Sequence, residues 1–381
     1  MDELDVDWGE TFSGIGEDWE VIERVLPSGW QDAARETGAL IRTRGFDSPA
    51  ALLRVLLIHL SDGCSLRETA VRARVGGLAH VSDVALLNRL RGCGEWFRWI
   101  GEQMSQRLSN TSADILPGKR VRLVDASVVC EPGATGSTWR LHYVIDLATL
   151  RCEQAHITLP DEGETLTRFA VTPGDVMMAD RGLAHRRGIR HVTSHGGDVV
   201  VRMNLMSVPL EEAKREGAVF EILPRLRRLK IGEVKGWKAL VRDEQGTIPV
   251  QVCALKKSAE QTRKAQEKLR RTADRKGREL RPETIEAAGY VIVLTTMIEA
   301  DAEVILELYR HRWQIELAFK RLKSLLQLGH LKKTDPEGAK AWLQGKLLVA
   351  TLIEMLIAVG ERFSPWGYLL RPSQRTALPL A

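Results

Sequence analysis

The spacing of apolar residues changes near Lys119, and this change constrains the fold more than any other feature of the 381-residue chain. Before it, apolar residues recur at helical spacing, most clearly in 50–60, which predicts an all-α segment. After it, β-branched residues form short runs such as Val121–Val129, which are typical of strands. Hairpin-connected strands followed by alternating helices and strands predict an α/β fold with a mixed sheet covered by helices.

Composition sets weaker limits. Hydrophobic residues make up 44% and charged residues 28% of the chain, as in ordinary globular proteins. No apolar run approaches the roughly 20 residues needed to span a bilayer, so no membrane partner is expected. The first twenty positions hold eight acidic and no basic residues, unlike a signal or transit peptide. The five cysteines form no C-x-x-C pair, which argues against disulfides or a thiolate zinc site and favours a reducing cytoplasm.

The net charge of +5 is mild, but it is unevenly distributed. Between Lys256 and Arg281, eleven lysine and arginine residues stand against four acidic residues. Such a stretch is either the solvated face of a helix or loop, or a strip that binds a polyanion. The charge pattern alone leaves both interpretations open.

Two short helices are expected between residues 65 and 90. Ser65 and Ser82 are their candidate N-caps, and Gly76-Gly77 breaks the pattern between them. The arrangement is typical of a helix-turn-helix, but similar helix pairs also occur in domains that bind no DNA. In a DNA-binding unit, the second helix would present Asn88, Arg89 and Arg91.

Further elements follow from the same patterns. Strands are expected at 139–147, 153–159, 174–180 and 198–203, with shorter ones at 219–223, 237–241 and 248–255 and another from Tyr290. A long helix is expected over 302–327, with Asp301 as its cap and Gly329 as its stop, and another over 336–359.

The long helix carries a stripe of polar residues beside its apolar face. At about 100° per residue, the stripe lies within an arc of about 60°. One interpretation is a surface stripe with an i,i+4 ion pair, and the other is a phosphate-binding edge beside a metal ligand. The stripe consists of Tyr309, Arg312, Glu316 and Lys323.

Two aspartates lie within or at the end of apolar strands. Asp125 lies in mid-strand between Val124 and Ala126, where an uncompensated charge costs several kcal/mol. Asp180 ends an apolar strand. Together with Glu316 they form a plausible all-oxygen ligand set, which favours Mg²⁺ or Mn²⁺.

The order of these motifs resembles family four of the bacterial insertion-sequence transposases. The matching residues are Leu-Val-Asp125-Ala-Ser, Trp139-Arg-Leu-His-Tyr, Ala-Asp180-Arg-Gly and Tyr309-x2-Arg312-x3-Glu316-x6-Lys323, which span about 119–328. The resemblance implies an RNase H-like catalytic core of the DDE type. It also implies a β-rich insertion before the glutamate helix.

The resemblance also implies roles for individual residues. Asp125, Asp180 and Glu316 would hold two divalent ions for phosphoryl transfer, and no nucleotide cofactor is expected. Tyr309, Arg312 and Lys323, with Arg181 after the second aspartate, would bind phosphates of the transposon end. A hairpin intermediate with a flipped base would follow, and the candidates to stack on that base are Tyr290 and Trp237.

The implied organisation has five parts and leaves three functions open. The parts are a helical end-binding domain at 1–115, core segments at 116–204 and 289–330, an insertion with the basic strip at 205–288, and a helical segment at 331–381. The leading function is a cytoplasmic transposase, nucleoid-associated when bound to DNA, that acts on inverted repeats and target DNA as a homodimer. The alternatives are an RNase H-like nuclease or domesticated relative without strand transfer, and an inactive DNA-binding repressor.

Overall fold

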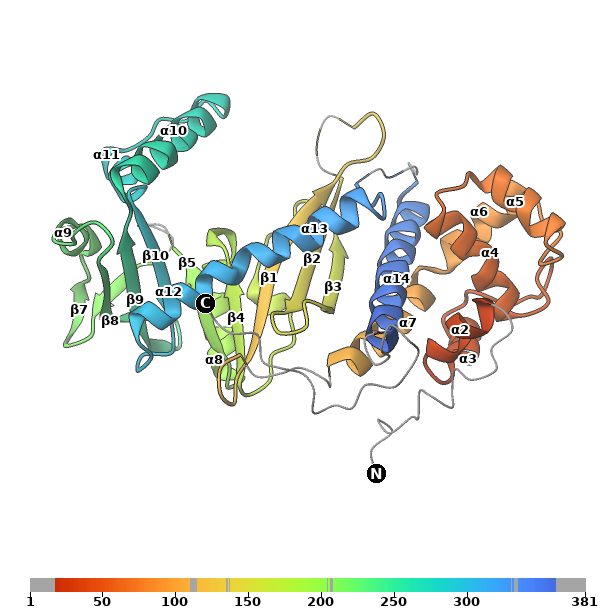
Figure 1. Ribbon diagram of the computed structural model, residues 1–381, viewed down its shortest axis with the longest axis horizontal. Helices are drawn as coiled ribbons and strands as arrows, with labels where there is room; N and C mark the ends of the chain where they lie inside the picture. The colour runs from red at the N-terminus through yellow and green to blue at the C-terminus, as the bar shows by residue number, and fades with distance from the viewer. Residues whose placement is uncertain are drawn as a thin grey trace.

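The computed structural model describes residues 18–109, 115–134, 136, 138–203, 205, 208–329, 331 and 335–360. Helices gather at one end, a long sheet forms the middle, and a pair of helices projects from the far end (Figure 1). The chain therefore has the mixed α/β architecture predicted from the sequence, with an all-α part before the sheet.

The helical end confirms the expected helix pair and its caps. Ser65 Oγ accepts a hydrogen bond from the backbone N–H of Glu68 at 3.1 Å, and Ser82 Oγ accepts one from Ala85 at 3.2 Å. The helices of this end are α2 (Asp18–Val25), α3 (Trp30–Glu36), α4 (Pro49–Ser61), α5 (Leu66–Val75), α6 (Asp83–Gly92) and α7 (Gly94–Ser109).

One 10-stranded sheet runs through the molecule in the order β3-β2-β1-β4-β5-β10-β9-β8-β6-β7. β1, β2 and β3 are antiparallel to one another, and β4 and β5 run parallel to β1. This half of the sheet has the order and directions of an RNase H-like core. The strands are β1 (Arg120–Val129), β2 (Trp139–Asp146), β3 (Cys152–Thr158), β4 (Asp175–Ala179), β5 (Asp198–Arg202), β6 (Leu210–Glu212), β7 (Arg215–Val219), β8 (Val234–Asp243), β9 (Gly246–Lys256) and β10 (Tyr290–Thr295).

Each face of the sheet has its own hydrophobic core. Successive side chains of a strand point to opposite faces, so Leu123 and Met178 join one core and Val124 and Ala179 join the other. The first core includes α12 (Ala302–Arg310) and α13 (Gln314–Ser324), which cross the face of the sheet seen in Figure 1. The second includes α8 (Arg186–Ser194) and α9 (Ile222–Arg227).

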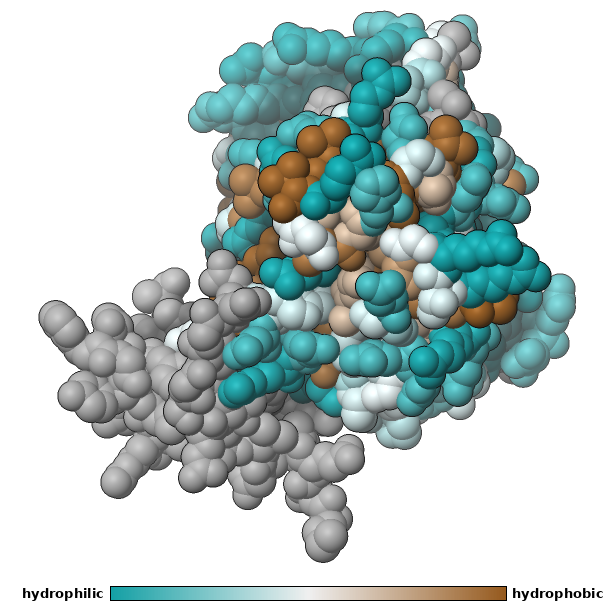
Figure 2. All heavy atoms as spheres, turned by 90° about the vertical axis from the view of Figure 1, so that its right-hand side faces the viewer, coloured by the Kyte–Doolittle hydropathy of each residue, from teal (hydrophilic) through white to brown (hydrophobic). Residues whose placement is uncertain are grey.

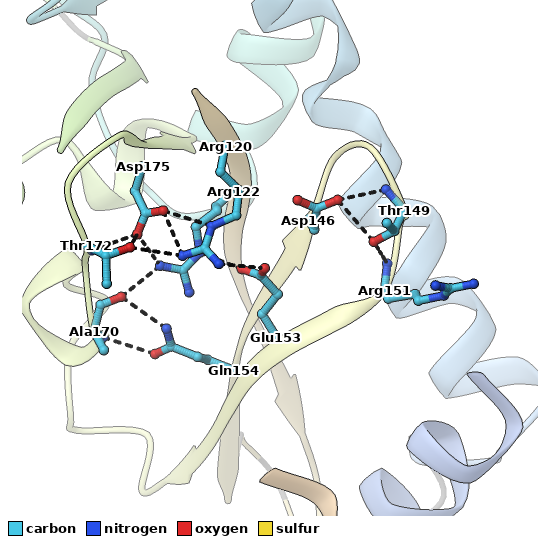
Figure 3. A network of polar contacts seen from close by, with 10 residues as sticks. All are labelled: Arg120, Arg122, Asp146, Thr149, Arg151, Glu153, Gln154, Ala170, Thr172 and Asp175. Atoms are coloured by element: carbon cyan, nitrogen blue, oxygen red, sulfur yellow. Dashed lines mark hydrogen bonds and ion pairs between the residues drawn. The ribbon is translucent and has the colours of Figure 1, made fainter. Parts of the chain in front are cut away.

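A buried ion network fixes the register between β1 and β4. Arg122 is 2% exposed and donates to Glu153 Oε2 at 2.6 Å and to Asp175 Oδ2 at 2.9 Å (Figure 3). A slip of either strand would leave these charges unpaired in the interior, at a cost of several kcal/mol. The network therefore holds Asp175, the first residue of β4, against β1. It thereby also determines which residues of β1 and β4 are paired at the other end of β4.

One of the expected strands differs from the structure. The run 219–223 was expected to be a strand, but β7 ends at Val219 and residues 222–227 form α9. Pro224 lies in the first turn of this helix, where its missing N–H costs nothing, whereas in a sheet it would break the ladder. Most of the basic stretch forms α10 (Ala259–Arg275), with α11 (Pro282–Ala287) after it, which agrees with the expectation of a helix or loop there.

The long helix expected over 302–327 is interrupted. Asp301 caps it as expected, with its Oδ1 accepting from the N–H of Glu303 at 3.2 Å. A 3₁₀ turn, η3 (His311–Trp313), separates α12 from α13, and α13 ends at Ser324 rather than near Gly329. A 3₁₀ turn has 3.0 residues per turn, so the angles calculated for one continuous α-helix do not hold across η3, although Arg312 and Glu316 still form the expected i,i+4 ion pair.

The C-terminal helix α14 (Pro336–Gly360) is long and apolar enough to cross a membrane, contrary to the expectation that no segment is. Within the fold, 72% of its most apolar window is buried, and it packs against α7, α6 and α4. Its Lys346, 2% exposed, donates to the backbone oxygen of Leu60 at 2.5 Å. The helix is therefore apolar because it forms the core between the helical end and the sheet.

The outer surface of the helical end is mixed in character. Figure 2 shows hydrophilic side chains covering most of its described part, with apolar patches between them. The exposed apolar residues on these helices and their loops include Ile41, Val71, Val75 and Val84.

Candidate active site

Asp125 and Asp180 lie side by side at the carboxyl ends of two parallel strands. The β1–β4 ladder ends with Val124 paired to Ala179, and each aspartate follows directly after one member of that pair. Because side chains alternate between faces, both aspartates lie on the face that α12 and α13 cover. The carboxyl ends of parallel strands are where α/β folds place their sites.

Burial without a full set of partners makes Asp125 unusual. Its side chain is 24% exposed, and among the described residues its Oδ1 accepts only the N–H of Ala126, at 2.8 Å. Burial raises the pKa of this carboxyl from 3.8 to about 6, and the negative charges of Asp180 and Glu164 add to the rise, whereas the Ala126 hydrogen bond and Arg312 oppose it. The site therefore concentrates negative charge in a place that favours a bound cation.

The break between α12 and α13 places Arg312 between the carboxylates. Its Nη2 donates to Glu316 Oε1 at 2.5 Å, and its Nη1 lies 3.9 Å from Asp125 Oδ2. Glu316 lies on the first turn of α13, which packs on β1, but its side chain is 60% exposed. Among the described residues, no three His, Cys, Asp or Glu side chains converge as metal ligands, and Glu316 is paired with Arg312.

Tyr309 and Lys323 occupy opposite ends of the same helical pair. Tyr309 is 8% exposed, and neither its hydroxyl nor Asp180 Oδ1 has a hydrogen-bond partner in the described part of the chain. Burial, and then the charge of Asp180, raise the pKa of Tyr309 well above its usual value. Lys323 lies two turns beyond Glu316 on α13 and is half-buried. The structure thus brings Tyr309, Arg312 and Asp180 together and leaves Lys323 farther along the helix.

A basic pocket of about 570 Å³ opens at the same end of the sheet. It is lined by Arg181, Arg202 and Lys257, with Tyr290 and residues of α10 and α11 on its other walls. Burial, and then repulsion from the two arginines, lower the pKa of Lys257 to about 8. Burial and the charge of Arg202 lower the pKa of Arg181 in the same way. Mutually repelling cations that are partly buried form a site for an anion.

The chain is similar to known proteins over most of its length. A family model described as "Transposase DDE domain" matches residues 117–352, more than half of the chain. The chain belongs to the DDE transposases. It is thus a DNA transposase, an enzyme that cleaves and joins DNA strands.

Individual relatives agree with this assignment. The transposase is 37% identical over 361 residues to the putative transposase InsL of insertion sequence element IS186A from Escherichia coli (strain K12), which covers 92% of this chain and 96% of that protein. It is also 37% identical over 362 residues, with the same coverage, to the transposase of insertion sequence element IS421 from Escherichia coli. The solved structure of a piggyBac transposase synaptic complex with hairpin DNA has a TM-score of 0.48 and 9% identity, over 96% of this chain and 76% of that one.

The residues expected to read DNA in the transposase make contacts within the chain. Arg89 donates to the backbone oxygens of Arg42 at 2.5 Å and Arg44 at 3.2 Å. Arg91 donates to Asp335 Oδ1 at 2.9 Å and to Asn88 Oδ1 at 3.1 Å, and thereby ties α6 to the start of α14. These bonds would have to be exchanged for DNA contacts.

Of the two aromatic candidates in the transposase, Tyr290 lines the basic pocket and Trp237 does not. Trp237 lies on β8 and packs against the second core. Trp313, next to Arg312, is 48% exposed.

Two further residues at this site, Arg202 and Glu164, were not found from the sequence, whereas Lys257 belongs to the predicted basic strip. Arg202 ends β5, and a single cation at a strand end has no distinctive pattern. Glu164 lies in the loop after β3, far from the other acids in sequence. Only the sheet order, which places β5 beside both β4 and β10, brings these groups to one end.

Proposed function

We propose that Asp125, Asp180 and Glu316 hold two divalent cations, Mg²⁺ or Mn²⁺, at which the transposase cleaves and joins DNA. DDE transposases in general use divalent metals, and the residues here fit such ions. The donors are all carboxylate oxygens, and Asp180 Oδ1 is buried without a hydrogen-bond partner among the described residues. The proposal rests on this unpartnered oxygen of Asp180, which lies next to the Asp125 carboxyl, whose pKa is raised.

When bound, the ions activate the attacking water or 3′-hydroxyl and stabilise the leaving oxygen. The two aspartates fix the position of this chemistry, since strands and a buried ion network hold them. Glu316 completes the ligand set by turning from Arg312 toward Asp125. The flexible, 60% exposed side chain of Glu316 permits that turn.

Arg312 then becomes free to bind a phosphate of the DNA strand at the site. It is 14% exposed, so its charge acts in a poorly screened environment. Tyr309 donates its unpartnered hydroxyl to the same strand, and Lys323 contacts a phosphate farther along. These three residues hold the scissile phosphate in line rather than transfer protons.

The basic pocket receives the nucleotide next to the cleavage position. Arg181 binds its phosphate, and Tyr290 stacks on a base flipped out of the helix, as a hairpin intermediate requires. The pocket geometry favours Tyr290 over Trp237 for this role. The basic helix α10 continues from the pocket and contacts the backbone of the same DNA.

The rest of the chain recognises the DNA and pairs the ends. Residues 1–115, with Asn88, Arg89 and Arg91, bind the terminal inverted repeats, and the segments 116–204 and 289–330 form the catalytic core. The insertion 205–288 supplies the pocket wall and the basic strip, and α14, within the segment 331–381, packs against the helical end and the sheet. Two copies form the synaptic complex, and they act on cytoplasmic DNA.

Glu316→Gln tests the proposal directly, with Glu307→Gln as the matched control. Glu307 lies on α12 and pairs at 2.8 Å with Arg310, away from the site. We expect Glu316→Gln to abolish Mg²⁺-dependent cleavage of a duplex that carries the element's end, while both variants bind that duplex in a gel-shift assay. Cleavage by Glu316→Gln at the rate of the control would refute the assignment.

A joining assay separates this function from that of a nuclease. A pre-cleaved end with a 3′-hydroxyl should be inserted into target DNA by the native transposase. Cleavage without joining would favour the nuclease interpretation, and binding without any metal-dependent turnover would favour the repressor.

A further inference from the structure

The segment around the turn between α9 and β8 is strongly basic, and it lies at the end of the molecule away from the helical end (Figure 1). Residues 225–238 hold six lysine and arginine residues and one acid, Glu233. Three of these cations, Arg228, Lys230 and Lys235, are exposed, and their side chains have no hydrogen-bond or ion-pair partner among the described residues. Unpaired cations grouped on a surface attract a polyanion such as the DNA backbone.

Ile231 lies among these cations and is 64% exposed. It is one of the two middle residues of the turn Lys230–Glu233, in which the N–H of Glu233 donates to the backbone oxygen of Lys230 at 3.0 Å. Gly232, the other middle residue, has a φ of +78°, which fits the left-handed position of a type II turn. The middle residues of such a turn have no strand neighbours, so the isoleucine forms an apolar tip on a basic surface.

Hydrogen bonds hold this turn to the end of β9. The N–H of Gly232 donates to the backbone oxygen of Lys256 at 2.9 Å, and the N–H of Lys256 donates to the backbone oxygen of Glu233 at 3.3 Å. Lys256 Nζ also donates to the backbone oxygen of Leu229 at 2.8 Å. The Glu233 carboxylate accepts the N–H of Lys230 at 2.7 Å, so the one acid of the segment stabilises the turn. The apolar tip is therefore fixed in advance, and a partner that binds it needs to order little of the chain.

The turn lies at the same end of the sheet as the candidate active site. β4 and β5 end there, and the antiparallel β10 begins there with Tyr290. Lys256, the partner of Tyr290, and the start of β8 at Val234 follow along the same end of the sheet. Four steps in the strand order separate β4 from β8, which corresponds to about 19 Å at about 4.8 Å per step. A duplex that lies along this end would span both places, which are about five to six base pairs apart.

We propose that the turn Lys230–Glu233 is a second DNA contact of the transposase, at which Ile231 inserts between base pairs in the minor groove and bends the duplex. Proteins that bend DNA insert apolar side chains such as isoleucine in this way, while cations hold the phosphates nearby. Here Arg228 and Lys230 precede the isoleucine and Lys235 follows it, so cations lie on both sides of it in the chain. The inference goes beyond the proposed function, because neither the carboxylates nor the basic pocket takes part in it.

The bend of a duplex bound to the intact transposase, measured by fluorescence energy transfer between dyes at its two ends, tests the inference. Ile231→Ala should reduce the bend by about 20° or more, which is the smallest kink that such insertions produce. Val219→Ala is the control, because Val219 is 74% exposed in the same insertion but lies outside the turn. Equal bends with the native, Ile231→Ala and Val219→Ala proteins would overturn the inference.

The salt dependence of binding separates the apolar tip from the cations around it. Replacement of Arg228, Lys230 and Lys235 by alanine should lower the magnitude of the slope of log K against log salt by up to about 3. Ile231→Ala should leave that slope unchanged, since an apolar side chain neutralises no phosphate. A lower slope in Ile231→Ala, or an unchanged slope in the triple variant, would contradict this division of roles and the inference with it.

A duplex with the element's end and a duplex of unrelated sequence show which DNA the turn bends. Loss of the bend in Ile231→Ala with the end duplex assigns the turn to the element, and loss with the unrelated duplex assigns it to target DNA. Sedimentation of the free protein tests the alternative that the tip contacts a second copy of the chain. If Ile231→Ala changes the oligomeric state while the bend stays native, the inference is wrong.

Discussion

Asp125→Asn should make the metal-free transposase more stable while it removes activity. The carboxyl has a pKa of about 6 in the fold against 3.8 as its ordinary value, a rise of about two units. Each unit corresponds to about 1.4 kcal/mol, so ionised Asp125 costs about 3 kcal/mol of folding free energy at neutral pH. Asparagine has nearly the same shape and carries no charge, so the variant avoids this cost.

The sign follows from linkage between protonation and folding. Because the pKa of Asp125 is raised in the fold, its protonated form favours folding below pH 3.8, and that contribution is lost as pH rises through 6. The free energy of unfolding of EDTA-treated protein, from urea denaturation, should therefore rise in the variant by about 1 kcal/mol at pH 4.5 and about 3 kcal/mol at pH 7.5. A variant that is less stable than the native protein at pH 7.5 would refute the reasoning.

Asp175→Asn is the control with the opposite expected sign. Asp175 is 1% exposed and accepts hydrogen bonds from Arg120 and Arg122, each at 2.9 Å. Its neutralisation leaves buried cations without their partner and should lower the free energy of unfolding by about 3–5 kcal/mol. The two substitutions are chemically identical, so opposite signs can only come from their surroundings.

Three further outcomes are expected. Replacement of Lys268, Arg271 and Arg275 on α10 by alanine should lower DNA affinity, measured by fluorescence anisotropy. The slope of log K against log salt should fall by up to about 3 in magnitude, and an unchanged slope would exclude α10 from the DNA interface. Tyr290→Leu should abolish the 2-aminopurine signal of a flipped base that Tyr290→Phe retains, and equal signals would remove Tyr290 from that role. Gly345→Ala, whose Cβ would lie 2.6 Å from Leu60 Cδ1, should lower the free energy of unfolding in urea by about 1–3 kcal/mol. Gly101→Ala, whose Cβ would meet no atom within 4 Å, should not lower it, and equal losses would contradict the packing of α14.

From the sequence, we could predict site residues that recur at helical spacing or that lie within or at the end of an apolar strand. Asp125 was predicted because a charged residue interrupts a buried strand, and Glu316 because one helix was expected to carry it together with Tyr309, Arg312 and Lys323. The identity of these residues as ligands stays a prediction. Glu164 carried no such signal, because its approach to the turn after Asp180 depends on contacts between segments separated in the chain.

The fold was predicted best where local periodicity dominates. Helices, strands and the caps at Ser65, Ser82 and Asp301 follow from short-range rules. The break at His311–Trp313 has no glycine or proline to mark it, so no local rule reveals it. The joining of β6–β9 to the core sheet through β10 depends on long-range pairing, which spacing along the chain does not encode.

The positions of Mn²⁺ ions in a crystal of the transposase with end-bearing DNA, located by anomalous scattering, test the central claim most directly. Manganese bound by the carboxylates of Asp125, Asp180 and Glu316, with Arg312 moved to a phosphate, is the result expected here. Manganese held elsewhere, with Arg312 still paired to Glu316 in the DNA complex, would contradict it.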